Sequence, residues 1–247
     1  MEFIMILNSI SMIQSGNWRE AIIQILLTLP VIMFALAWHE AAHGYVAYKM
    51  GDPTARNFGR LTLNPAKHLD PMGFLAMMIL GFGWAKPVPI NPRLFDNPKR
   101  GMALSAIAGP MANFLSGSIG AILYGFAAAW NLKLSFTPDV PLLLYNVSNV
   151  LCMLFYLWAM YNFIFMVFNL IPLPPFDGSR FFLQFLPADK YFKIMQYEKY
   201  ILIGVFVFIW GCSYVFNFSP FSFAANKVFN TIATPFYRMG RNIFFAS

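Results

Sequence analysis

The chain has 247 residues, of which 59% are hydrophobic and only 11% are charged, whereas soluble domains carry about 25% charged residues. This composition excludes an ordinary soluble domain and indicates a protein with several membrane-spanning helices. The net charge of +7 comes from 17 Lys and Arg against 10 Asp and Glu, but the basic residues gather in a few connecting stretches without a continuous basic face, so nucleic acid is excluded as an expected partner.

The predicted elements begin with an N-terminal apolar segment, residues 1–20, which we expect to be an interfacial or re-entrant piece. A spanning helix needs about 20 mostly apolar residues. Four later stretches approach or exceed that length, and they cover about 21–48, 101–130, 142–171 and 200–217. We therefore predict an all-α polytopic membrane protein with about four to six transmembrane helices.

Residues 73–92, GFLAMMILGFGWAKPVPINP, lie between the first and second of these helices. They begin as an apolar stretch that is too short to cross a bilayer, and they then become rich in glycine, proline and β-branched residues. This pattern predicts a short re-entrant or β-hairpin segment.

The last residues, 218–247, are aromatic and weakly basic, and Pro220 and Pro235 interrupt them. They are predicted to form a C-terminal interfacial or partly embedded segment. The longest connection between helices, about 49–100, is itself partly apolar and leaves no room for a separate domain. Residues 21–217 are therefore expected to form a single transmembrane domain.

Basic residues predict how the helices are oriented, because cytoplasmic loops carry an excess of Lys and Arg. In the connection between the second and third helices, Lys133 is the only basic residue. The side on which the first and third helices end is therefore expected to face the cytoplasm. Its basic residues are Lys49, Arg56, Arg60, Lys67, Lys86, Arg93, Lys99, Arg100, Arg180, Lys190, Lys193 and Lys199.

His39, Glu40 and His43 stand in ALAWHEAAHGYVA, inside the first predicted helix. Histidines four residues apart share one face of an α-helix, so both imidazoles can bind one metal ion, and HExxH on a helix is typical of zinc metalloproteases. Two alternatives stay open. Neighbouring helices or water could satisfy these polar side chains, or the cluster could serve a membrane protein that binds or transports a metal ion.

The histidine pair needs another protein ligand, because a catalytic zinc ion takes three and keeps one position open. After the third helix, prolines end the apolar run and Asp177-Gly178 makes a turn in FNLIPLPPFDGSR. The charge pattern places this turn and the end of the first helix on the same side of the membrane. We therefore predict Asp177 as the third ligand of one Zn²⁺ ion per chain, with a plain Asp-Gly turn as the alternative. The remaining histidine, His68, is expected to form hydrogen bonds within its polar loop.

Three motifs together resemble the site-2 protease family of intramembrane zinc metalloproteases: HEAAH, GPMAN at 109–113 and NLIPLPPFDG at 169–178. HLDPMG at 68–73 and GWAKPVPINP at 83–92 are similar to the compact branch of that family, whose members lack a PDZ domain. The resemblance covers about 35–180.

The resemblance implies that His39, His43 and Asp177 bind zinc and that Glu40 is the catalytic acid and base. It also implies that Asn169 helps to hold the substrate backbone and that Asn113 lines the site, so both are predicted as substrate-binding residues. For Asn113 the residues alone leave a second interpretation, in which its amide bridges helices.

On this resemblance the chain is predicted to be an intramembrane zinc metalloprotease, which hydrolyses peptide bonds of transmembrane segments with Glu40 moving the proton of a zinc-activated water. The expected partners are the lipid bilayer and a substrate that is either a transmembrane protein or a remnant signal peptide. We also expect the extended part of the inter-helix segment, WAKPVPIN, to pair with this substrate as an added strand. The expected location is the cell membrane, as a multi-pass protein of a bacterial inner membrane with the active site toward the cytoplasm.

Overall fold

The computed structural model describes residues 15–80, 85–216 and 218–246. The described chain is mostly helical, and it holds no β-strand beyond an isolated antiparallel bridge between Leu69 and Ala85. This confirms the all-α prediction. The α-helices in chain order are α2 (Trp18–Lys49), α3 (Thr54–Asn57), α4 (Pro71–Leu80), α5 (Pro98–Phe136), α6 (Leu142–Asn169), α7 (Asp177–Phe182), α8 (Ala188–Met195), α9 (Glu198–Phe216) and α10 (Pro220–Phe245).

Four helices of the described chain are long and apolar enough to cross a membrane: α2, α5, α6 and α9. They correspond to the four predicted stretches, which confirms the polytopic membrane architecture. α2 begins a few residues earlier than predicted, at Trp18, so the end of the predicted N-terminal segment is part of this helix. The rest of that prediction falls largely on residues 1–14, which lie outside the described chain.

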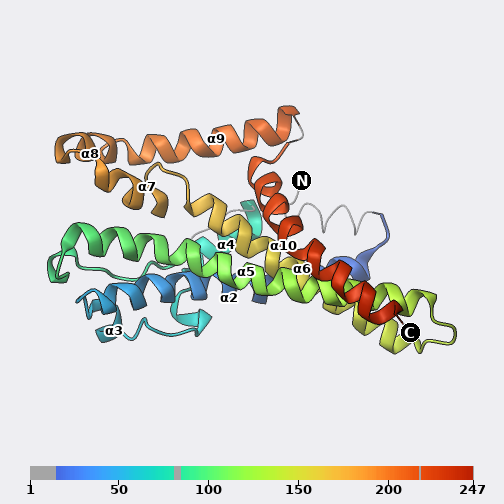
Figure 1. Ribbon diagram of the computed structural model, residues 1–247. Coiled ribbons are helices and arrows are strands. Elements are labelled where there is room, and N and C mark those ends of the chain that lie inside the picture. The colour runs from blue at the N-terminus through green and yellow to red at the C-terminus, as the bar shows by residue number, and fades with distance from the viewer. Residues whose placement is uncertain (1–14, 81–84, 217, 247) are drawn as a thin grey trace.

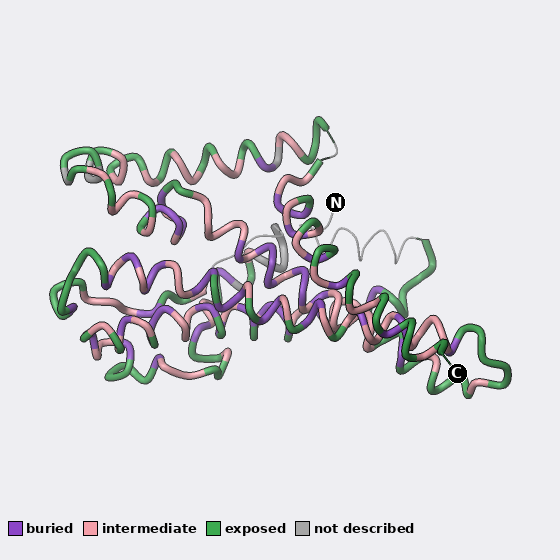
Figure 2. Tube along the Cα trace, viewed as in Figure 1, coloured by how far each residue is buried: buried purple, intermediate pink, exposed green. Residues whose placement is uncertain are grey.

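The helix α5 lies at the centre of the bundle and packs against α2, α6 and α10, as Figure 1 shows. Its buried positions are mostly Gly, Ala and Ser, which let helix backbones approach closely in a membrane protein. A side-chain carbon at Gly125 would lie 2.7 Å from the Ala233 carbonyl oxygen of α10, so this crossing depends on glycine. In Figure 2 the buried residues follow the facing sides of these helices.

The C-terminal residues form one helix, α10, and its two prolines do not interrupt it. Pro220 occupies the first turn, where a missing backbone N–H costs little, and the Ser219 side chain caps that turn. Pro235 lies inside the helix. α10 packs on α5 and α6, and it adds Phe229 to the hydrophobic core. The division of the chain into domains near residue 217, and the place of α10 relative to the bilayer, stay predictions.

The predicted re-entrant stretch begins as the helix α4 and returns to its starting point. The bridge between Leu69 and Ala85 pairs the residues on either side of this excursion. The described chain therefore returns at Ala85 to a point beside Leu69, and residues 81–84 lie outside the described chain.

The extended segment 85–91 is held by the loop that follows α2. The N–H of Lys86 donates to the His68 carbonyl oxygen at 2.8 Å. The N–H of Asn91 donates to the carboxylate of Asp52, a fully buried side chain, at 2.7 Å. These bonds fix the segment beside the C-terminal half of α2.

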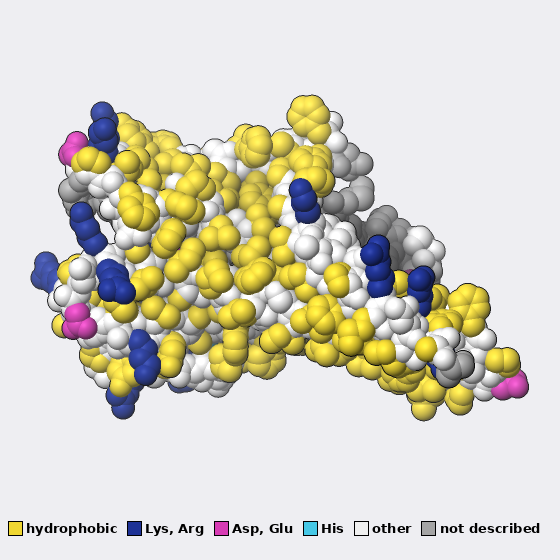
Figure 3. Space-filling model, in the orientation of Figure 1, with side chains coloured by type: hydrophobic (Ala, Val, Ile, Leu, Met, Phe, Trp, Pro, Cys, Tyr) yellow, Lys and Arg dark blue, Asp and Glu magenta, His cyan; other side chains and the backbone are white. Residues whose placement is uncertain are grey.

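Charged side chains lie mostly toward the two ends of the molecule, and a broad hydrophobic surface lies between them, as Figure 3 shows. Lys and Arg gather at the end where α2 finishes and α3 and α8 lie. Such a surface fits a protein whose middle contacts lipid tails and whose ends contact water.

Candidate metal centre

His39 and His43 lie one turn apart on α2, on the side that faces α5. Their Nε2 atoms are 2.9 Å apart, and the two rings meet at an angle of 85°. Both residues are buried, with exposures of 4% and 8%. The sharing of one helix face that the spacing predicted is therefore confirmed.

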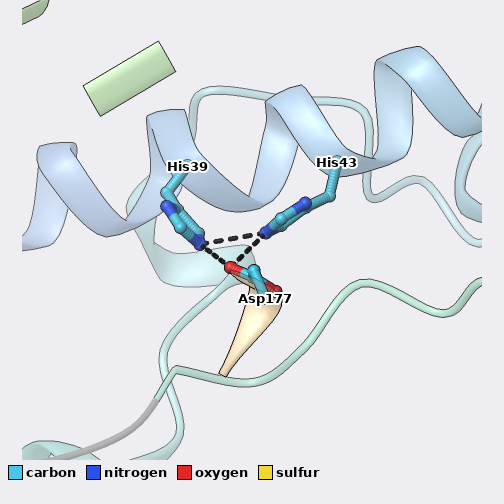
Figure 4. A group of neighbouring side chains, drawn as sticks. All are labelled: His39, His43 and Asp177. Carbon is cyan, nitrogen blue, oxygen red and sulfur yellow. Dashed lines mark hydrogen bonds and ion pairs between the residues drawn. The ribbon is translucent and has the colours of Figure 1, made fainter. Parts of the chain in front are cut away.

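Asp177 is the first residue of α7, and it reaches the histidine pair from the other side, as Figure 4 shows. Its Oδ2 atom lies 3.0 Å from the Nε2 of His39 and 3.2 Å from the Nε2 of His43. Gly178 lets the chain turn there, because a side-chain carbon at that position would lie 2.4 Å from the Leu170 carbonyl oxygen. The structure thus brings together the three side chains that the sequence predicted as ligands, across 138 residues of chain.

The Nδ1 atom of each imidazole, the ring nitrogen that does not face Asp177, already contacts a carbonyl oxygen. The Nδ1 of His39 lies 2.5 Å from the Oδ1 of Asn113, and the Nδ1 of His43 lies 2.6 Å from the Ser105 carbonyl oxygen. A carbonyl oxygen only accepts, so the proton of each neutral ring belongs on Nδ1. Two Nε2 lone pairs then face the Asp177 carboxylate when both rings are neutral, and a cation between these three acceptors, either a proton or a metal ion, stabilises them.

The donor set fits a zinc ion. Its three ligand atoms all lie within 4.8 Å of one another. In a tetrahedral site with bonds of about 2.0–2.2 Å, ligand atoms lie roughly 3.3 Å apart, so the three atoms would have to separate by only a few tenths of an ångström. Two imidazoles and one carboxylate that leave a fourth position open are also typical of catalytic zinc. Hydrogen bonds from the second ring nitrogen orient ligating histidines, as those from Nδ1 of His39 and His43 do in this centre.

The Asp177 carboxylate is ionised in this setting. Burial by itself would raise its pKa, but protonated imidazoles of His43 and His39 outweigh that effect and hold the pKa of the carboxyl well below its usual range. The carboxylate is therefore available as an anionic ligand at neutral pH.

Asn113 links three helices behind the ligand pair. Its amide nitrogen, which is fully buried with the rest of the residue, donates to the Ala35 carbonyl oxygen of α2 at 3.3 Å and to the Asn162 side chain of α6 at 2.9 Å. This places its amide oxygen toward His39. Asn113 therefore bridges helices and orients one ligand at once, and its predicted contact with a substrate stays a prediction.

Gly109 gives the two imidazoles their space on the α5 side. A side-chain carbon there would lie 2.4 Å from the Nε2 of His43 and 2.6 Å from the Cε1 of His39. The glycine of the GPMAN motif is thus required by the close approach of both rings.

The Glu40 carboxylate contacts the extended segment. Its Oε2 atom accepts a hydrogen bond from the Val88 N–H at 2.9 Å. It follows His39 directly in α2, so a residue of segment 85–91 positions the carboxylate predicted to act as acid and base.

Asn169 lies half-buried at the end of α6, where its side-chain nitrogen donates to the Phe165 carbonyl oxygen of the same helix at 3.0 Å. Its contact with a substrate stays a prediction. His68 hydrogen-bonds through Nε2 to the Thr62 carbonyl oxygen at 2.8 Å, as expected for a loop histidine.

Sequence reasoning missed three partners of the centre: Ser105, Asn162 and Val88. Ser105 and Val88 act through their backbone C=O and N–H groups, and the residue type does not indicate which backbone groups are used. Asn162 did carry a signal, because a primary amide inside an apolar helix needs a hydrogen-bonding partner.

Two comparisons with known proteins bear on this centre. The model of peptidase family M50 matches residues 27–212. The chain is also 40% identical over 178 residues to the Bacillus subtilis (strain 168) protein named "Putative zinc metalloprotease YwhC", and the alignment covers 72% of this chain and 76% of that protein. No solved structure matches the chain.

Proposed function

The chain belongs to peptidase family M50 and is a membrane zinc metalloprotease, and from this we propose that it cleaves peptide bonds of transmembrane segments within the membrane. The observation that carries the proposal is the convergence of the His39, His43 and Asp177 ligand atoms on one point, with both Nδ1 atoms already satisfied. A zinc ion bound there would acidify a water molecule and polarise the scissile carbonyl.

Glu40 is proposed to carry the proton in this reaction. Its carboxylate is anchored by the Val88 N–H, next in sequence to a ligand, and it would accept a proton from the attacking water and deliver it to the departing amide nitrogen. One carboxylate thus serves as base and then as acid.

The substrate is proposed to be a transmembrane protein or a remnant signal peptide that reaches the site in extended form. A helical peptide keeps its carbonyl groups in hydrogen bonds, so it must unwind before hydrolysis. The ligands lie on or next to helices that can cross a membrane, and the His39 and His43 side chains are buried inside the bundle.

Segment 85–91 supports binding of an extended substrate. We propose that it pairs with the substrate as an added strand, and its hydrogen bonds limit which groups can pair. Its N–H groups at Lys86, Val88 and Asn91 are already used within the protein, and prolines have none. The N–H of Ile90 has no hydrogen-bond partner within the described residues. The carbonyl groups from Val88 to Ile90 accept no hydrogen bond within the described residues. A substrate strand would therefore donate its N–H groups to these carbonyls.

The active site is proposed to face the cytoplasm of a bacterial inner membrane. α2 carries the histidines in its second half and leads at Lys49 into the stretch rich in basic residues, and α7 begins with Asp177 and contains Arg180. An excess of Lys and Arg marks the cytoplasmic side.

The Glu40→Gln variant tests the mechanism, because it keeps the shape of the side chain and removes its basicity. We expect it to retain zinc by elemental analysis and to lose roughly 10²- to 10⁴-fold in cleavage of a transmembrane peptide in proteoliposomes. Glu20→Gln, in the exposed first turn of the same helix, is the matched control and should cleave normally. Normal cleavage by Glu40→Gln would contradict the proposed mechanism. Absence of cleavage by the unchanged protein would instead favour a metal-binding or transport function, which needs no role for this carboxylate.

A further inference from the structure

A second concave site lies beside the extended segment, outside the metal centre. It is an open pocket of about 540 Å³ between the loop that follows α2 and the segment 85–91. Three basic residues line it, Arg60 and Lys67 from the loop and Lys86 from the segment, together with apolar residues that include Phe58 and Leu69. The three basic side chains have no role in the proposed hydrolysis.

The positive charge of the pocket has no counter-charge in the described chain. The ion pairs among the described residues are those between the histidines and Asp177, so no carboxylate lies within 4.0 Å of the three basic groups. Two side chains, Lys67 and Lys86, are exposed. An uncompensated cluster of this kind attracts an anion.

Arg60 makes this pocket a built site. It is only 8% exposed, and its Nη2 atom makes two long hydrogen bonds, of 3.4 Å and 3.3 Å, to the carbonyl oxygens of Lys86 and Pro87. A guanidinium group carries five N–H donors, so other donors remain for a ligand. A planar fork of this kind matches the oxygens of a phosphate group.

The surroundings of the pocket favour the phosphate of a lipid headgroup. α3 and the chain that follows it lie at the end of the molecule where Lys and Arg gather next to the hydrophobic surface, as Figures 1 and 3 show. Phe58, at the rim of the pocket, is 71% exposed, and nearby Leu63 is 50% exposed. Exposed apolar residues beside basic ones are typical of the zone where lipid headgroups lie, and the cytoplasmic leaflet is anionic.

We propose that this pocket binds the phosphate group of an anionic phospholipid. Arg60 and Lys67 contact the phosphate from the loop, and Lys86 contacts it from the segment. A bound headgroup therefore joins the loop to the segment whose Val88 anchors Glu40. The effect on Glu40 rests on the proposed function, but the binding itself does not.

Native mass spectrometry of the full-length protein in detergent tests the proposal. Phosphatidylglycerol and phosphatidylcholine with identical acyl chains are titrated separately, and the affinity for the first bound lipid is compared. We expect tighter binding of phosphatidylglycerol, and we expect Lys67→Gln/Lys86→Gln to weaken it by roughly tenfold to thirtyfold without changing phosphatidylcholine binding. Lys190→Gln/Lys193→Gln removes the same charge elsewhere on this end and should leave both affinities unchanged.

Equal affinity for the two lipids, or equal losses in the two double variants, would overturn the proposal. Inorganic phosphate distinguishes the sources of the ligand. Its displacement of phosphatidylglycerol supports recognition of the phosphate group, whereas binding of phosphate without binding of the lipid overturns the lipid assignment. Displacement by an acidic peptide but not by phosphate also overturns it.

The zinc content of each variant shows whether it is folded, and Lys67→Gln alone serves if the double variant loses zinc. All of these readings are independent of peptide cleavage, so the lipid site and the proposed protease mechanism can fail separately.

Discussion

The two histidines of the metal centre use both ring nitrogens, one toward Asp177 and one toward a carbonyl oxygen. The carbonyl decides which nitrogen keeps its proton, and it therefore decides which nitrogen is free to bind the metal ion. The residues that hydrogen-bond to the ligands therefore contribute to the affinity for the metal ion, even though they would not contact the ion.

Removal of the Asn113 side chain tests this point. In Asn113→Ala the Nδ1 of His39 loses its acceptor, so the ring can rotate or protonate on the wrong nitrogen. We expect the affinity for zinc to fall roughly 10- to 100-fold, as measured by competition with a chelator. Asn131→Ala is the control, because that amide lies on the same helix and bonds to Ser148 and Asn149. Equal zinc affinities in the two variants would contradict the orienting role.

The backbone N–H of Val88 can be removed without removing Glu40. Val88→Pro deletes the donor in a segment that already holds prolines on either side. A hydrogen bond to a charged group is worth about 1.5–3 kcal/mol, so kcat should fall roughly 10- to 100-fold while zinc content is unchanged. Val88→Ala keeps the N–H and controls for the lost side chain. If both variants cleave at the same rate, the N–H does not position the carboxylate.

The sequence predicted the metal-binding side chains better than the groups that hydrogen-bond to the centre. The spacing of His39 and His43, and the carboxylate of Asp177 after an apolar run, carried enough chemistry to predict the ligands. The Ser105 carbonyl and the Val88 N–H could not be predicted, because every residue has a backbone and only the tertiary fold selects which group is used.

The crossing of α2 and α5 is the element-scale feature on which the ligand geometry depends. Gly109→Ala would place a carbon 2.4 Å from the Nε2 of His43, and neither ring can move aside and still meet Asp177. We expect zinc affinity to fall at least about 100-fold. Elemental analysis after gel filtration measures this loss. Gly204→Ala on α9 has no atom within 4 Å of the new carbon and should retain zinc. A full zinc content in Gly109→Ala would show that the helices separate easily.

Hydrophobic length predicted the existence of the long helices, and their ends shifted by a few residues in the structure. The C-terminal stretch shows what the prolines alone could not predict, because Pro220 and Pro235 both belong to the continuous helix α10. Pro220 stands at a position that tolerates proline, and Pro235 stays helical in a helix that packs on α5 and α6. Local propensity could not reveal that packing, which needs the whole bundle.

The molecule as a whole is held together by an aromatic core between α5, α6 and α10. The Phe229 ring of α10 lies 5.1 Å from the ring of Tyr124 and 5.3 Å from that of Tyr156, measured between centroids. This core joins the C-terminal helix to the bundle that carries the metal centre.

Truncation of this ring tests the contribution of α10. Phe229→Ala should destabilise the protein by about 3–5 kcal/mol, because it leaves a cavity in the core. Phe223→Ala changes a ring of the same helix that is 61% exposed, and it should have little effect. Thermal unfolding of the two variants in the same detergent provides the comparison. Equal midpoints would show that α10 adds little to the stability of the bundle.

The separation of 138 positions between His39 and Asp177 also sets an order of events during biosynthesis. A nascent chain that ends before residue 177 presents two imidazoles to the translocon but no carboxylate to join them. The cation can be captured by all three donors only after α7 has left the ribosome and docked against α2. A prematurely terminated product therefore lacks the third ligand and cannot assemble the metal centre.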